Sequence, residues 1–153
     1  MLPFHIYDVF TDTPFTGNPL AIVEEADGLT TGQMQRIARQ FNLSETIFVQ
    51  TPDDPSHTAK VRIFFPMAEI PFAGHPTIGC ALHLAGDGAG PVTLEEVAGL
   101  VPVTIERSGP SRLAEFTAPK LPRALPGRPD RATVAAALGL SEADLAPTAL
   151  GNF

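Results

Sequence analysis

A chain of 153 residues has the length of one ordinary domain, and with 44% hydrophobic residues it can bury a core, so we expect a globular protein. Its formal net charge of −7 argues against binding to nucleic acid or to an anionic membrane surface, because both require a basic face. The sequence has no signal-peptide pattern and no apolar run long enough to span a membrane, and its single cysteine excludes an internal disulfide. We therefore expect a cytoplasmic protein that acts on small molecules or proteins.

The first forty residues predict a β-hairpin followed by a helix. Residues 5–10 alternate between apolar and polar side chains, and residues 20–23 are apolar and β-branched enough to form a second strand. A turn-rich loop joins them. Thr30 or Thr31 can cap a helix whose apolar side chains recur at spacings of three and four, and this helix should end near Asn42.

The middle of the chain predicts two further hairpins on either side of an apolar helix. Residues 46–50 and 60–65 are expected to pair as antiparallel strands across a turn. Residues 77–85 form a short apolar stretch best interpreted as a helix. Residues 101–106 and 112–117 then predict another antiparallel pair with one face turned inward.

These elements predict an α+β fold in which a curved, mostly antiparallel sheet surrounds a central helix. The proline-rich residues 119–129 indicate an extended linker, and residues 130–138 can form a short helix. The apolar residues 147–153 have no obvious packing partner. We therefore expect one domain over residues 1–119, and over residues 120–153 a linker with the start of an incomplete second domain.

The stretch FAGHPTIG, residues 72–79, is the first candidate site. Pro76 suits a first helical turn, where its missing N–H costs nothing. The free backbone N–H groups of that turn, at the positive end of the helix dipole, could hold a carboxylate above Gly74 and His75. From the residues alone, His75 could equally transfer a proton or satisfy backbone groups at the helix start.

A second candidate is Glu45, in the junction NLSET over residues 42–46. A carboxylate at the junction of two elements can be held over a pocket and act as a general acid or base, while Ser44 and other short polar neighbours form hydrogen bonds with it. The pattern by itself favours the alternative, a solvated loop glutamate beside ordinary helix-ending residues.

The remaining chemically active side chains give weaker signals. His83 lies on the apolar helix and is expected to be a packed, hydrogen-bonded side chain, whereas His5 and His57 have no predicted partner. No His, Asp and Glu residues show the spacing of a metal site, so we expect none. Cys80, inside an alanine and leucine helix, is expected to be a small buried hydrophobic residue instead of a nucleophile.

Five motifs resemble, in order and spacing, the N-terminal half of the PhzF-like family. They are DVFTD (8–12), PFTGNPLA (14–21), FNLSET (41–46), RIFFP (62–66) and EIPFAGHPTIG (69–79). The resemblance extends over roughly residues 4 to 120. It implies a diaminopimelate epimerase-like fold, in which two similar halves each wrap a curved sheet around a helix and the active site lies between them. It also implies a cofactor-independent isomerase like the phenazine-biosynthesis enzyme, which rearranges a dihydro-hydroxyanthranilate.

The resemblance assigns roles to residues of these motifs. It places the proton-shuttling glutamate at Glu45 and the active-site histidine at His75. Related epimerases carry a catalytic cysteine where this chain has Ala73, which disfavours a two-cysteine racemase mechanism. The expected substrate-binding residues are Asn18, Ser44, Gly74, Pro76 and Thr77.

Full-length members of the family are nearly twice as long, and their second half supplies an aspartate and a glycine-rich anion-binding loop. We therefore expect impaired isomerase activity from this chain alone, on a small carboxylate-bearing substrate. The chain could be a fragment of a longer isomerase, or it could form a homodimer that completes the site. The alternative function is a non-catalytic module that binds a carboxylate or another protein.

Overall fold

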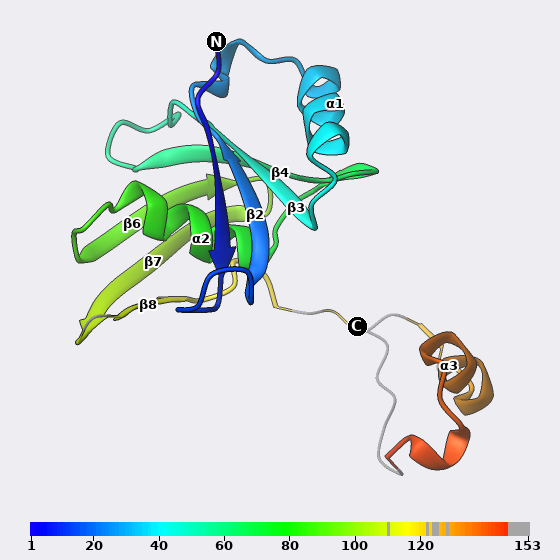
Figure 1. The fold of residues 1–153 in the computed structure, drawn as a ribbon. Helices are drawn as coiled ribbons and strands as arrows, with labels where there is room; N and C mark the ends of the chain where they lie inside the picture. The colour runs from blue at the N-terminus through cyan, green and yellow to red at the C-terminus, as the bar shows by residue number, and fades with distance from the viewer. Residues whose placement is uncertain (110, 122, 124–125, 128, 147–153) are drawn as a thin grey trace. The chain divides into compact units, whose positions relative to one another are not determined.

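The structure is a computed structural model that describes residues 1–109, 111–121, 123, 126–127 and 129–146 (Figure 1). The chain divides into two compact units, Met1–Lys120 and Leu121–Phe153. The first unit contains all the candidate site residues. The sequence expectation for residues 147–153 lies outside the described residues.

The first unit is built on one curled sheet. In the part of the chain that is described, the sheet has eight strands in the order β1-β2-β3-β4-β6-β7-β8, with β5 paired to β4. All pairs are antiparallel except β2 with β3 and β4 with β6. The strands are β1 Phe4–Val9, β2 Asn18–Val23, β3 Glu45–Gln50, β4 Ala59–Phe65, β5 Ala68–Ile70, β6 Gly90–Glu96, β7 Gly99–Ser108 and β8 Ser111–Phe116.

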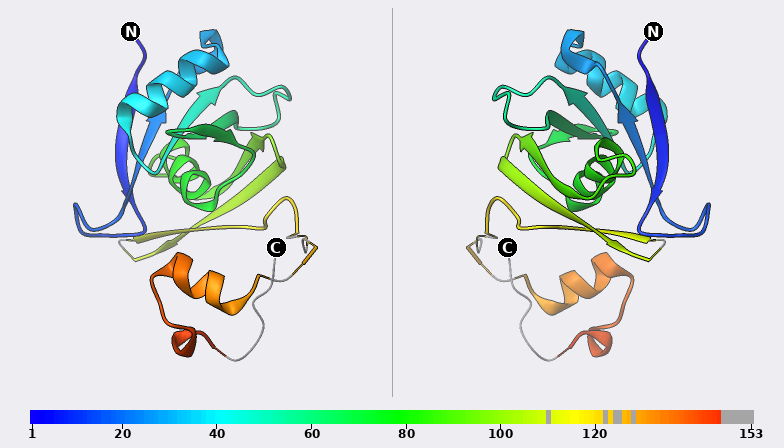
Figure 2. Two further views of the ribbon diagram at one scale, coloured as in Figure 1. Left: turned by 90° about the vertical axis from the view of Figure 1, so that its right-hand side faces the viewer. Right: turned by 90° about the vertical axis from the view of Figure 1, so that its left-hand side faces the viewer.

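Helix α2, Gly74–Leu84, lies inside the curl of this sheet (Figure 2). Residues 76 to 81 of α2 are all buried, including Cys80. Gly79 faces β2 and β1 so closely that an added Cβ would lie 2.5 Å from Leu20 and 2.8 Å from Val9. The α2 side chains therefore share one core with the inner face of the strands. The expected α+β architecture, a curved sheet around a central helix, is confirmed.

Helix α1, Thr31–Phe41, covers a second cluster on the other face of the sheet. Thr30 caps it as expected, in a capping box with Gln33. Met34 of α1 is fully buried beside Phe48 and Phe64, whose rings meet edge to face with centroids 5.4 Å apart.

Several boundaries differ from the sequence expectation. Helix α2 begins at Gly74, before the apolar stretch 77–85 that was expected to be helical, and Pro76 lies in its first turn as predicted. Strands β5 and β6 were not predicted. Strand β6 begins with the dipeptide Gly90-Pro91, which is typical of a turn, yet β6 pairs along its whole length with β7. Its strand conformation depends on this partner and not on local preference.

The second unit contains α3, Arg131–Leu138, and the short 3₁₀ helix η2, Glu142–Asp144. The Asp130 side chain caps α3 by accepting from the backbone N–H of Thr133, and Gly139 ends the helix with φ of 68°. None of the helices in the described residues is both long and apolar enough to cross a membrane.

Candidate active site

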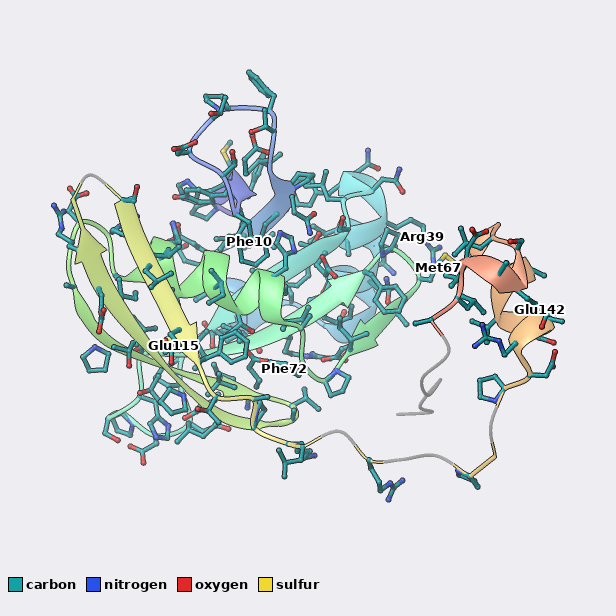
Figure 3. The ribbon with its side chains drawn as sticks, turned by 90° about the horizontal axis from the view of Figure 1, so that it is seen from below. Phe10, Arg39, Met67, Phe72, Glu115 and Glu142 are labelled. Atoms are coloured by element: carbon teal, nitrogen blue, oxygen red, sulfur yellow. The ribbon has the colours of Figure 1, made fainter. Side chains whose placement is uncertain are left out.

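The parallel pairing of β2 and β3 brings the candidate residues together. Two parallel strands begin at the same edge of a sheet, and here Asn18 is the first residue of β2 and Glu45 the first of β3. The first turn of α2 presents His75 to this edge. Phe10, which is labelled in Figure 3, lies in the turn after β1. Its ring centroid is 5.9 Å from that of His75.

His75 forms hydrogen bonds through both of its ring nitrogens. Nδ1 lies 2.9 Å from Glu45 Oε2, and Nε2 lies 2.9 Å from the backbone oxygen of Asn18. The side chain of His75 is 9% exposed and that of Glu45 is 22% exposed. The histidine is thus enclosed, while the carboxylate partly faces the solvent.

These two contacts restrict where the protons lie. A backbone carbonyl oxygen can only accept, so Nε2 of His75 must carry a proton that it donates to Asn18. The bond between Nδ1 and Glu45 then contains one further proton, either on the carboxyl group of Glu45 or on the ring of His75. In both arrangements the pair is electrically neutral overall and holds a single transferable proton.

Ser44 and Asn42 fix the loop that leads from α1 to Glu45. Ser44 Oγ donates to Asn18 Oδ1 at 3.1 Å, which joins the loop before β3 to the start of β2. Asn42 ends α1 in the left-handed conformation, with φ of 53°, and so turns the chain from the helix into this loop. Asn18, Ser44, Glu45 and His75 therefore form one connected set of hydrogen bonds.

The other candidate residues at the α2 start have different surroundings. An added Cβ at Gly74 would lie 3.3 Å from the Phe116 ring, and Pro76 is buried. Thr77 is also buried, and its hydroxyl oxygen lies 2.7 Å from the backbone oxygen of Ala73. The backbone N–H groups of Gly74 and His75 have no acceptor within the helix, so they are the donors that the first turn offers to a ligand.

Sequence reasoning missed Glu96, which lies close to this helix start. Glu96 Oε1 is 2.6 Å from Thr77 Oγ1, and Oε2 is buried with no hydrogen-bond partner among the described residues. Burial raises the pKa of this carboxyl group to about 7. The alternation of Val92, Leu94 and Glu96 on the inner face of β6 is the signal that could have found it.

Two residues have the surroundings of structural groups. Cys80 is fully buried, and burial raises the pKa of its thiol, as befits an unreactive core residue. His57, which had no predicted partner, lies 2.7 Å from Glu95. Backbone N–H groups of Asp53 and Asp54, together with His57, lower the pKa of Glu95 to about 2.

The family model for phenazine biosynthesis-like proteins (PhzC-PhzF) matches residues 7–152 of this chain. The chain belongs to this family. An uncharacterised isomerase of Mesorhizobium japonicum is 50% identical over 140 residues, which is 89% of this chain and 46% of that protein. A trans-2,3-dihydro-3-hydroxyanthranilate isomerase of Pseudomonas aeruginosa is 42% identical over 103 residues, 67% of this chain and 37% of that protein.

Two solved structures agree with the fold. A predicted epimerase of Pseudomonas aeruginosa superposes with a TM-score of 0.76 at 33% identity, over 94% of this chain and 52% of that one. A PhzF-family protein of Bacillus anthracis gives a TM-score of 0.72 at 33% identity, over 94% of this chain and 48% of that one. The chain thus spans about half the length of these relatives.

Proposed function

We propose that this chain supplies the acid–base residues of a cofactor-independent isomerase that acts on a small carboxylate-bearing substrate. The observation that carries the proposal is the hydrogen-bonded series from Asn18 through His75 to Glu45, with 2.9 Å at each of its two contacts. Membership of a family with several proteins named as isomerases supports it.

In this mechanism Glu45 is the catalytic acid–base. As a carboxylate it removes a proton from one carbon of the substrate, the double bond shifts, and the carboxyl group, whose proton can exchange with solvent, delivers a proton to another carbon. No atom is gained or lost, so the reaction needs no second reactant. His75 is held by the carbonyl of Asn18 and fixes the orientation of Glu45. Between the two proton transfers, it shares through its hydrogen bond the proton that Glu45 carries.

The substrate carboxylate would bind at the start of α2. The N–H groups of Gly74 and His75 point outward from the helix at the positive end of its dipole, which favours an anion. The 42% identity to the Pseudomonas aeruginosa enzyme supports trans-2,3-dihydro-3-hydroxyanthranilate as the first substrate to test. Since this enzyme is nearly twice as long as the present chain, we expect low turnover from these 153 residues alone.

The test is to incubate the purified chain with this compound in D₂O and follow both turnover and deuterium incorporation by NMR. Glu45→Gln and His75→Asn should abolish both signals. His57→Asn is the matched control, because His57 also pairs with a glutamate, at 2.7 Å from Glu95, but is not part of the proposed site. Light scattering on the same samples tells whether activity belongs to a monomer or a homodimer.

Two outcomes would contradict the proposal. The first is turnover that persists in Glu45→Gln. The second is a chain that neither turns over the compound nor binds it, judged by chemical-shift changes at the backbone N–H groups of Gly74 and His75. Binding without turnover in the wild type, lost when the substrate carboxylate is removed, would favour the non-catalytic carboxylate-binding module.

A further inference from the structure

Three side chains that are potential metal ligands meet at a second place, away from Glu45. His5 comes from β1, Glu24 follows the end of β2, and His83 lies in the last turn of α2. Glu24 Oε1 is 2.7 Å from Nε2 of His5 and 3.1 Å from Nε2 of His83. One potential ligand atom from each residue lies within 4.8 Å of the other two.

The donor set has the chemistry of a zinc site. Two imidazole nitrogens and one carboxylate oxygen occur as the protein ligands of three-ligand Zn²⁺ sites, in which a fourth position is left to water or another ligand. A tetrahedral ion with bonds of about 2.0–2.1 Å separates its ligand atoms by roughly 3.3 Å. The 2.7 Å distance from Glu24 to His5 would therefore have to lengthen by about 0.6 Å and the 3.1 Å distance to His83 by about 0.2 Å, while the two histidine nitrogens lie within 4.8 Å of each other.

Tyr7 holds the His83 ring in the orientation that such a site requires. The Tyr7 hydroxyl lies 2.8 Å from Nδ1 of His83, so Nε2 is the nitrogen that faces Glu24. A hydroxyl can donate or accept, and it therefore suits the ring both before and after Nε2 binds a metal. Ligand histidines generally have such a partner on their second nitrogen.

The scaffold fixes two of the three ligands. The His83 side chain is only 13% exposed, on a helix enclosed by the sheet. Glu24 is anchored by its backbone N–H, which donates to the carbonyl of Pro3 at 3.0 Å. His5 is 44% exposed, and its ring lies beside that of His83 with centroids 4.7 Å apart. A metal here would have access to solvent on the side of His5.

Tyr7 and His83 also line a pocket of about 850 Å³ between β1, the second half of α2 and β8. Glu45 and His75 do not line this pocket. From this geometry we infer that His5, Glu24 and His83 form a binding site for a divalent transition metal of the zinc class, with Tyr7 as the positioning residue. The metal links the edge strand β1 to the end of β2 and to the central helix.

The experiment uses the full chain, freed of any histidine tag, with Zn²⁺ measured by titration calorimetry and Co²⁺ by visible absorption. We expect one metal ion per chain and the intense visible bands of tetrahedral Co²⁺. Glu24→Gln, His83→Gln and His5→Gln should each abolish stoichiometric binding. Tyr7→Phe should weaken Zn²⁺ binding by about 10-fold, the effect of losing the partner of a ligand histidine.

His57→Gln is the matched control, because His57 pairs with Glu95 but has no third ligand beside it among the described residues. It should leave Zn²⁺ affinity unchanged. Zn²⁺ should also raise the Tm of the wild type and of this control, since it binds only the folded chain, but not that of His5→Gln. His5 is exposed on an edge strand, so its variant keeps the test decisive if His83→Gln does not fold.

Absence of stoichiometric Zn²⁺ binding by the wild type would overturn the inference. So would binding that survives both His5→Gln and His83→Gln, or binding that His57→Gln weakens as much as they do. The result does not depend on the proposed isomerase, because none of these variants touches Glu45, His75 or Asn18. Turnover measured on the same variants keeps the two proposals separate.

Discussion

Replacing Glu96 by glutamine removes a buried charge beside the candidate site without changing the shape of the side chain. Glu96 is 8% exposed, and one carboxyl oxygen contacts the Thr77 hydroxyl while the other has no partner among the described residues. A carboxylate in this position loses its hydration and gains little in return. An amide of the same size avoids this cost and can still form a hydrogen bond with Thr77.

The magnitude follows from the pKa of Glu96, which burial raises from 4.5 to about 7. Below pH 4.5 the group is protonated in both the folded and the unfolded chain. As the pH rises from 4.5 to about 7, the unfolded chain releases its proton first, so the free energy of unfolding falls. Above that range the free energy of unfolding has fallen by about 3 kcal/mol, at about 1.36 kcal/mol for each pH unit between the pKa of the unfolded chain and that of the folded chain.

The assay is urea unfolding of the wild type and of Glu96→Gln at about pH 4.5 and about pH 8, with m-values compared to confirm two-state behaviour. Between these two pH values the free energy of unfolding should fall by about 3 kcal/mol more in the wild type than in the variant. Glu95→Gln is the matched control, because the pKa of Glu95 is lowered to about 2 and its titration lies below this range. Equal pH dependence in the wild type and in Glu96→Gln would refute the reasoning.

Two further predictions concern packing and proton placement. Gly79→Ala should destabilise the protein by about 1–3 kcal/mol in urea unfolding, because the new methyl group would lie 2.5 Å from the buried Leu20 side chain. Gly32→Ala, in the exposed start of α1, should instead stabilise it by up to about 1 kcal/mol, and equal effects at the two positions would contradict the packing argument. In ¹⁵N NMR spectra His75 should carry a proton on Nε2, since the carbonyl of Asn18 can only accept. A neutral ring with its proton on Nδ1 would show that this hydrogen bond is wrongly assigned.

Much of the fold was predictable because its signals are local. The capping box of Thr30 and Gln33 fixes the start of α1 within four residues of sequence. The alternation in residues 101–106 predicts a strand that the structure confirms within β7. Strand β6 was missed because Gly90 and Pro91 signal a turn, and only pairing with β7 overrides that signal.

The candidate site was predictable in part. The residue patterns alone left Glu45 and His75 open, and the family resemblance of their motifs implied the first as the proton shuttle and the second as the active-site histidine. Their direct contact, and the bond from His75 to the Asn18 carbonyl, depend on where β2, β3 and α2 meet. The roles of these residues remain predictions that the substitutions above test.

The sequence by itself determined the helices, the hairpins and the identity of the residues in the FNLSET and GHPT motifs, because capping, spacing and turn chemistry act over a few neighbouring residues. Only the tertiary structure decided which distant side chains meet. Curling of the sheet around α2 buries Glu96 against Thr77 and gathers His5, Glu24 and His83 from three separate elements. Such meetings depend on the closure of long loops and on strand order, which no local stretch of sequence encodes.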